Sequence, residues 1–175
     1  MHVRLKRTPG LYLAGFMGCG KTTVGRLLAE ELGWNFIDVD AEIESMQRQT
    51  IARIFAEQGE AAFRELESRA IRARVAAIEA GDPTVVALGG GAFVVRPNWE
   101  LIERNGITIW LDCPLDRIRS RLSADGVRPL AQDPLHFERL FEQRRPLYAR
   151  AHYSIDAGAG DPSEIVRSIL GLPIF

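Results

Sequence analysis

The chain has 175 residues, of which 46% are hydrophobic and 26% are charged, and its 22 basic and 23 acidic side chains leave a formal net charge of -1. This length predicts one compact domain over residues 1–175. No run approaches the roughly 20 consecutive apolar residues of a membrane span, and the balanced charge favours neither nucleic acid nor anionic lipid. We therefore expect no nucleic acid and no membrane among the partners.

The cysteines and the start of the chain indicate a compartment. Cys19 and Cys113 lie far apart in the sequence, form no metal-ligand pattern and are too few for a disulfide scaffold, which predicts a reducing compartment, the cytoplasm. The start is basic and precedes an apolar run at 11–17, as in a secretory signal, but Gly15 interrupts that short run. Residues 1–9 are predicted to be a flexible lead-in.

Short apolar runs alternate with longer segments of helical spacing. The predicted strands are 11–14, 35–39, 84–88, 108–111 and 152–155. The predicted helices are 21–32, 41–49, 51–80, 98–103, 115–122, 135–150 and 163–170. Because the strand-like runs are continuously apolar, they favour a parallel sheet covered by helices on both faces, which is a three-layer α/β fold. The segment 123–134, rich in Asp, Gly and Pro, is predicted to be a mobile loop.

The strongest motif is a phosphate loop at residues 15–22. Its sequence, GFMGCGKT, matches G-x-x-x-x-G-K-[ST] in full and lies between a predicted strand and a predicted helix. In such a loop backbone N–H groups and the helix N-terminus bind phosphate, Lys21 reaches the terminal phosphates, and Thr22 offers a ligand to Mg²⁺. The thiol of Cys19 is predicted to be reactive in this positive environment, unless it turns into the helix packing.

Two carboxylates, Asp38 and Asp40, follow the second predicted strand. They lie at the edge where open α/β sheets bind ligands, so one could hold the water shell of a metal and the other could bind or deprotonate an acceptor hydroxyl. The alternative is a pair of helix caps, with Asp40 well placed to cap residue 41 onward. The residues alone do not separate these readings.

The helix after Gly59 carries charge on its apolar side. Spacing of about 100° per residue places Arg64 and Glu67 inside the apolar arc, one turn apart. Buried charges are costly unless they are paired or face a polar pocket, so we interpret Arg64 as an anion receptor held by Glu67. The alternative is that Arg64 and Glu67 lie at the edge of the arc, with their charged groups in water.

Two further strand ends carry candidate groups. Gly89, Gly90 and Gly91 follow the third predicted strand and exclude side chains where backbone N–H groups could approach a small ligand, although a flexible turn is possible. Asp112 ends the fourth strand and competes with Asp38 for the metal, or it opens the next helix. The sequence has no N-K-x-D motif, so adenine is favoured over guanine.

Taken in order and at similar spacing, these motifs resemble the shikimate kinase family. They are the phosphate loop, Asp38-Val-Asp40, Phe63-Arg64 with Glu67, Gly89 to Gly91, Arg128-Pro-Leu130 and Arg144-Arg-Pro-Leu-Tyr148. The resemblance covers about 11–170. It implies a nucleoside-monophosphate-kinase-like P-loop NTPase fold with a five-stranded parallel sheet of order 2-3-1-4-5. It also implies one kinase domain with a substrate-binding segment at 40–80 and a lid at 123–134.

The resemblance also implies an activity and its residues. ATP and shikimate would give ADP and shikimate 3-phosphate in aromatic amino-acid biosynthesis, with Mg²⁺ as cofactor and a monomer as the working unit. The implied catalytic residues are Lys21, Asp40 and Arg128. The implied ATP-binding residues are Gly18, Cys19, Gly20, Lys21, Thr22, Thr23, Arg121 and Arg128. The implied shikimate-binding residues are Asp40, Arg64, Gly89, Gly90, Gly91 and Arg144. The implied metal residues are Thr22 and Asp38, so Asp112 loses the metal role. Arg121 and residues 155–162 would contact adenine.

Three points remain open in the sequence. Helical spacing does not choose between Arg144 and Arg145, and only the family pattern selects Arg144. A related kinase for gluconate or a nucleotide is a second reading, which Arg64, Glu67 and the three glycines oppose. A nucleotide-gated binding module that transfers no phosphate is the third, and no catalytic residue is missing to support it.

Overall fold

The structure is a computed structural model that describes residues 10–124 and 133–175. The predicted lead-in at 1–9 lies outside the described residues, as does the stretch 125–132 of the predicted lid, which includes Arg128. The described ends of that predicted lid are helical or cap a helix, since Ser123 and Ala124 end one helix and Asp133 and Pro134 begin the next.

The described residues form one parallel sheet covered by helices. The strands are β1 (Gly10–Ala14), β2 (Asn35–Asp38), β3 (Thr84–Ala87), β4 (Gly106–Asp112) and β5 (Tyr153–Asp156). The helices are α1 (Lys21–Leu32), α2 (Val39–Gln47), α3 (Ile51–Glu79), α4 (Arg96–Asn105), α5 (Leu115–Ala124), α6 (Pro134–Tyr148) and α7 (Pro162–Leu170). The strand order is β2-β3-β1-β4-β5 and every pairing is parallel, which confirms the predicted sheet.

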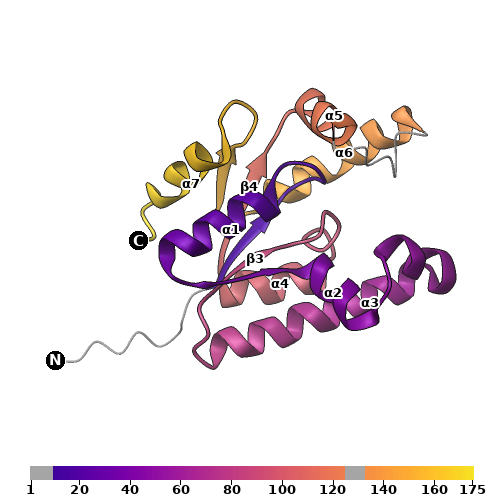
Figure 1. The fold of residues 1–175 in the computed structure, drawn as a ribbon, viewed down its shortest axis with the longest axis horizontal. Helices are drawn as coiled ribbons and strands as arrows, with labels where there is room; N and C mark the ends of the chain where they lie inside the picture. Colours follow the sequence, from indigo (N-terminus) through magenta and orange to yellow (C-terminus); the bar gives the residue numbers. More distant parts are fainter. Residues whose placement is uncertain (1–9, 125–132) are drawn as a thin grey trace.

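The core lies between the central strands and two helical layers. All five residues of β1 are buried, as expected for a strand that pairs on both edges and is covered on both faces. Helices α1 and α7 contact each other on one side of the sheet, and α3 and α4 contact each other on the other side (Figure 1). The three-layer prediction is therefore correct.

Capping residues explain where the helices begin. The carboxylate of Asp38 accepts the N–H of Ala41, so α2 begins at Val39, two residues before the predicted start. Asp161 and Glu164 form a capping box at the start of α7. The prolines at the starts of α4, α6 and α7 occupy the first turn, where the missing N–H costs nothing. That is why α4 begins at Arg96 rather than at the predicted residue 98.

Candidate active site

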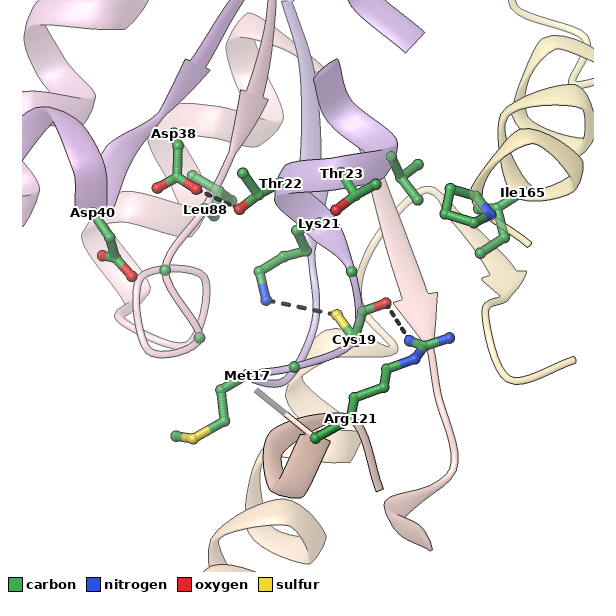
Figure 2. Close-up of a pocket in the computed structure, with 17 residues that line it drawn as sticks. Met17, Cys19, Lys21, Thr22, Thr23, Asp38, Asp40, Leu88, Arg121 and Ile165 are labelled. Atoms are coloured by element: carbon green, nitrogen blue, oxygen red, sulfur yellow. Dashed lines mark hydrogen bonds between the residues drawn. The ribbon is translucent and has the colours of Figure 1, made fainter. Parts of the chain in front are cut away.

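A pocket of about 540 Å³ lies at the carboxyl ends of β1, β2 and β3. It is lined by Met17, Gly18, Cys19, Gly20, Lys21, Thr22, Thr23, Val24, Asp38, Asp40, Leu88, Gly89, Gly90, Arg121, Ala124, Pro162 and Ile165. Figure 2 shows the phosphate-loop side chains facing the carboxylates of Asp38 and Asp40, with Arg121 and Ile165 at the other end. The pocket therefore joins motifs from five separate parts of the sequence.

The phosphate loop presents its backbone to the pocket. Gly18 and Gly20 have φ of 75° and 97°, a conformation that a side chain would strain. Gly20 is the N-cap of α1 and makes no side-chain capping bond, so the first N–H groups of the helix keep their capacity for an anion. This is the geometry that the motif predicts.

Lys21 is held inside the same loop. Its Nζ donates to the carbonyl oxygens of Gly15 at 2.8 Å and Phe16 at 2.9 Å, and lies 3.6 Å from Cys19 Sγ. Cys19 itself is 1% exposed. The structure therefore favours the alternative in which the Cys19 thiol packs inside and only its backbone faces a ligand.

Thr22 and Asp38 meet at the start of α1. The Thr22 hydroxyl donates to Asp38 Oδ2 at 2.5 Å, and Asp38 Oδ1 accepts the N–H of Ala41 at 3.1 Å. The cap of α2 is thus Asp38 and not Asp40, which lies in the first turn of that helix. A hydroxyl and a carboxylate are the hard oxygen donors that suit Mg²⁺, which usually keeps several waters and phosphate oxygens as further ligands. In the described ranges, no group of three or more His, Cys, Asp or Glu side chains is placed so that it could hold a metal.

Asp40 carries a carboxylate oxygen with unused capacity. Its Oδ1 is buried and, among the described residues, has no hydrogen-bond partner. Burial raises the pKa of Asp40, the neighbouring Asp38 and Glu44 raise it further, and Lys21 and Arg64 oppose the shift. An unsatisfied acceptor of this kind costs stability unless a ligand donates to it. Asp40 is therefore suited to accept a hydrogen bond or a proton from a hydroxyl.

Arg64 and Glu67 form the buried pair that the helical spacing predicts. Arg64 Nη1 donates to Glu67 Oε1 at 2.8 Å, and the side chain of Glu67 is 1% exposed against 24% for Arg64. Burial raises the pKa of Glu67, Arg64 opposes the shift, and Asp40 adds to it. A Cβ atom at Gly91 would overlap the Arg64 guanidinium, so the third glycine gives this arginine its place.

The structure separates the two adjacent arginines of α6. The guanidinium of Arg144 lies 5.9 Å from the centroid of the Phe16 ring, and its Nη1 lies 3.4 Å from where a Cβ of Gly90 would be. Arg145 instead donates to Asp112 Oδ2 at 3.1 Å and is half exposed. Arg144 therefore joins Arg64 beside the three glycines, and the carboxylate of Asp112 is engaged by Arg145.

Arg121 connects the phosphate loop with the segment before α7. Its two terminal nitrogens donate to the carbonyl oxygens of Cys19 and Ala157, each at 3.2 Å. Ala124, Pro162 and Ile165 line the same end of the pocket. Their apolar surfaces suit a flat base. The sequence does not identify Ala124 and Ile165, or Met17 and Leu88, as pocket residues, because a single apolar residue of a pocket looks like a core residue in a sequence.

A phosphate loop that faces two carboxylates across one pocket, with two arginines beside the glycines of the adjoining segment and on a parallel sheet of this order, defines a P-loop kinase. The comparisons with known proteins give the particular family. The family model described as shikimate kinase matches residues 17–172. A shikimate kinase of Persephonella marina is 42% identical over 162 residues, which cover 92% of this chain and 96% of that protein. The chain belongs to the shikimate kinase family.

Solved structures agree with this assignment. The structure of a shikimate kinase from Acinetobacter baumannii in complex with shikimate has a TM-score of 0.85 and 38% identity, covering 94% of this chain and 92% of that one. A gluconokinase from Sinorhizobium meliloti has a TM-score of 0.60 and 20% identity, covering 94% of this chain and 91% of that one. The second likeness shows the shared fold alone.

Proposed function

We propose that this chain catalyses the ATP-dependent phosphorylation of the 3-hydroxyl of shikimate, giving ADP and shikimate 3-phosphate in aromatic amino-acid biosynthesis. The observation that carries the proposal is one pocket that has a phosphate loop at one wall and Asp40, Gly89 and Gly90 at the other. Arg144 lies beside Gly90, and Arg64 lies beside the adjoining Gly91. A phosphoryl donor and a small anionic alcohol are the two ligands that such walls fit.

The nucleotide is held largely by backbone. The N–H groups of 18–23 and the start of α1 bind the phosphates, and Lys21 leaves the carbonyl oxygens of its own loop to neutralise the terminal phosphates. Arg121 lies against adenine together with the segment before α7. The side chain of Cys19 contributes no contact, consistent with its burial.

The metal position is assigned to Thr22 and Asp38. Thr22 would be a ligand of Mg²⁺ and Asp38 would hold its water shell, and the hydrogen bond between these two side chains already brings their oxygens together. When bound, Mg²⁺ supplies positive charge to the phosphate oxygens as charge develops in transfer. A second protein carboxylate is not needed for this.

The acceptor is held by side chains. Arg64 and Arg144 receive the carboxylate of shikimate, since planar guanidinium groups match a carboxylate in two-point hydrogen bonding. Gly89, Gly90 and Gly91 leave room for the ring. Asp40 accepts the hydrogen bond of the reacting hydroxyl and, with its raised pKa, takes the proton as the oxygen attacks phosphorus.

Arg128 completes the charge balance during transfer. Its role follows from the family motif Arg128-Pro-Leu130 in the predicted lid, outside the described residues. An arginine that meets the phosphoryl group only when a lid closes contributes to turnover rather than to the binding of either substrate alone.

The working unit is inferred to be a monomer in the cytoplasm, without nucleic acid or membrane as partner. The net charge of -1 and the pattern of two distant thiols support this inference. In the described part of the chain, no helix is both long and apolar enough to cross a membrane.

A coupled ADP-release assay tests the function directly. Shikimate, gluconate and AMP are each offered with MgATP, and turnover is expected with shikimate. Turnover with gluconate or AMP in place of shikimate would select the second reading, and ATP binding without turnover of any acceptor would select the binding module. Arg144→Ala and Arg145→Ala form a matched pair, in which the first is expected to raise the KM for shikimate and the second to leave it unchanged.

A further inference from the structure

The last residue of α6 reaches the glycine segment at the acceptor side of the pocket. Tyr148 is 2% exposed, and its hydroxyl donates a hydrogen bond to the carbonyl oxygen of Gly90. Its ring packs against Trp110 on β4, with 6.3 Å between the ring centroids. Because the ring is buried and packed against Trp110, the position of the hydroxyl is fixed.

This hydrogen bond restrains the peptide between Gly90 and Gly91. Glycine has no side chain to limit its φ and ψ, so a peptide between two glycines rotates easily. Peptides in the described ranges are all trans, so the Gly91 N–H points to the side opposite the Gly90 carbonyl. By accepting from Tyr148, the Gly90 carbonyl fixes the direction of both groups.

The same peptide lies between the two arginines of the acceptor site. A Cβ at Gly90 would be 3.4 Å from Arg144 Nη1 and 3.5 Å from the backbone nitrogen of Met17 in the phosphate loop. A Cβ at Gly91 would overlap the Arg64 guanidinium. A rotated peptide would bring its carbonyl oxygen toward the place of an anionic ligand, where its partial negative charge repels the ligand.

We propose that Tyr148 is a positioning residue for the acceptor, which fixes the Gly90–Gly91 peptide so that Arg64 and Arg144 receive the acceptor's carboxylate without a competing carbonyl. The inference rests on the proposed function, since it takes shikimate as the acceptor. Burial raises the pKa of Tyr148 well above its usual value, with Arg144 opposing the shift, so the hydroxyl remains a donor throughout the working pH range.

Tyr148→Phe removes this donor and leaves the ring packing in place. Loss of one neutral hydrogen bond is expected to raise the KM for shikimate about threefold to tenfold. The kcat and the KM for ATP are expected to stay within about twofold, because the phosphate loop and Lys21 are untouched. A purely structural tyrosine would lower stability without this split between the two substrates.

The chain offers a matched control in Tyr12→Phe. Tyr12 is 0% exposed, and its hydroxyl donates to Asn105, the last residue of α4, which does not line the pocket. Both variants lose one buried hydroxyl, so both are expected to lower the melting temperature, but only Tyr148→Phe is expected to change the KM for shikimate. An equal change in both, or failure of Tyr148→Phe to fold, would overturn the proposal.

A double-variant cycle separates the glycine route from a route through Arg144. Tyr148→Phe is measured in the Arg144→Ala background by calorimetric titration with shikimate. If Tyr148 acts through Gly90, the two losses multiply; if it acts by holding Arg144, the second loss vanishes and the proposal is overturned. Wild-type enzyme that does not turn over shikimate would reject the proposed function and this inference together, whereas normal turnover with an unchanged KM in Tyr148→Phe would reject this inference alone.

Discussion

The two ends of the pocket are built in different ways. The nucleotide end is formed mainly by consecutive residues of the phosphate loop, in which Lys21 is bonded to two carbonyl oxygens of its own loop while the first N–H groups of α1 stay open to an anion. At the acceptor end, side chains from α2, α3 and α6 gather around the three glycines, and Asp40 Oδ1 and Glu67 Oε2 are buried without hydrogen-bond partners among the described residues. The first end is stable before it binds, and the second carries a polar cost that a ligand can remove.

Arg128 is expected to give the largest effect, because the role proposed for it concerns the transferring phosphoryl group rather than the binding of either substrate. Arg128→Ala should lower kcat by about 10³ or more while the binding of each substrate alone changes little. Single-turnover kinetics with a rapid quench measures the transfer step. An unchanged transfer rate would mean that the lid carries no catalytic arginine.

Arg64 tests whether the acceptor end is independent of the nucleotide end. Arg64→Ala should weaken shikimate binding by about 1.5 to 3 kcal/mol, the cost of one charge-assisted contact, and should leave ATP binding nearly intact. Calorimetry with each ligand separately makes the measurement. Arg69→Ala is the control, since Arg69 lies on the same helix with its side chain 68% exposed. Equal losses of ATP and shikimate affinity would make Arg64 a structural residue.

Glu67 tests the polar cost of the acceptor end through pH. Because its pKa is raised in the folded protein, the folded state binds more protons than the unfolded state above the ordinary value of 4.5. The stability that Glu67 contributes is therefore present below pH 4.5 and is lost as the pH rises through the folded pKa. The unfolding free energy of Glu67→Gln minus that of the wild type, measured by urea titration, should increase as the pH rises from 4.5 through the folded pKa. A difference that is constant or shrinks with pH contradicts the buried cost.

The thiols should give the smallest effect. Cys19 and Cys113 are 1% and 3% exposed, so iodoacetamide should label both far more slowly in the folded protein than in urea, read by mass spectrometry. This replaces the expectation of a reactive Cys19. Rapid labelling of Cys19 that MgATP prevents would show instead that the nucleotide end opens before it binds.

The difference between the two ends also explains what the sequence could and could not predict. The phosphate loop and the pairing of Arg64 with Glu67 can be predicted because they depend on residues that are close in the chain. The parallel sheet can be predicted from the alternation of short apolar runs with helical segments. Helical spacing could not choose Arg144 over Arg145, because the choice depends on Asp112, which Arg145 contacts from another element.

The ends of helices and strands were also hard to predict from the sequence. Whether Asp38 or Asp40 caps α2 depends on where β2 ends, and the strand stops at Asp38, which pairs with Ala87 of β3. The motif Arg-Arg-Pro-Leu-Tyr does not predict the hydrogen bond of Tyr148, because its acceptor, the carbonyl oxygen of Gly90, lies far away in the sequence.

The break at Gly59 divides α3 into two stretches that differ in burial. Gly59 has φ of 85° and ψ of 171°, outside helical values, so the backbone ladder is interrupted there. Before the break Ile54 alone is fully buried among the described residues of the stretch, whereas after it Phe63, Glu67, Ala70, Ile71, Val75 and Ile78 all are. Amide protons of 51–58 should therefore exchange with deuterium through local opening, while those near Arg64 wait for a larger unfolding event. Arg64, for which we propose the role of acceptor binding, therefore lies in the stretch that is expected to stay folded when the start of its own helix frays.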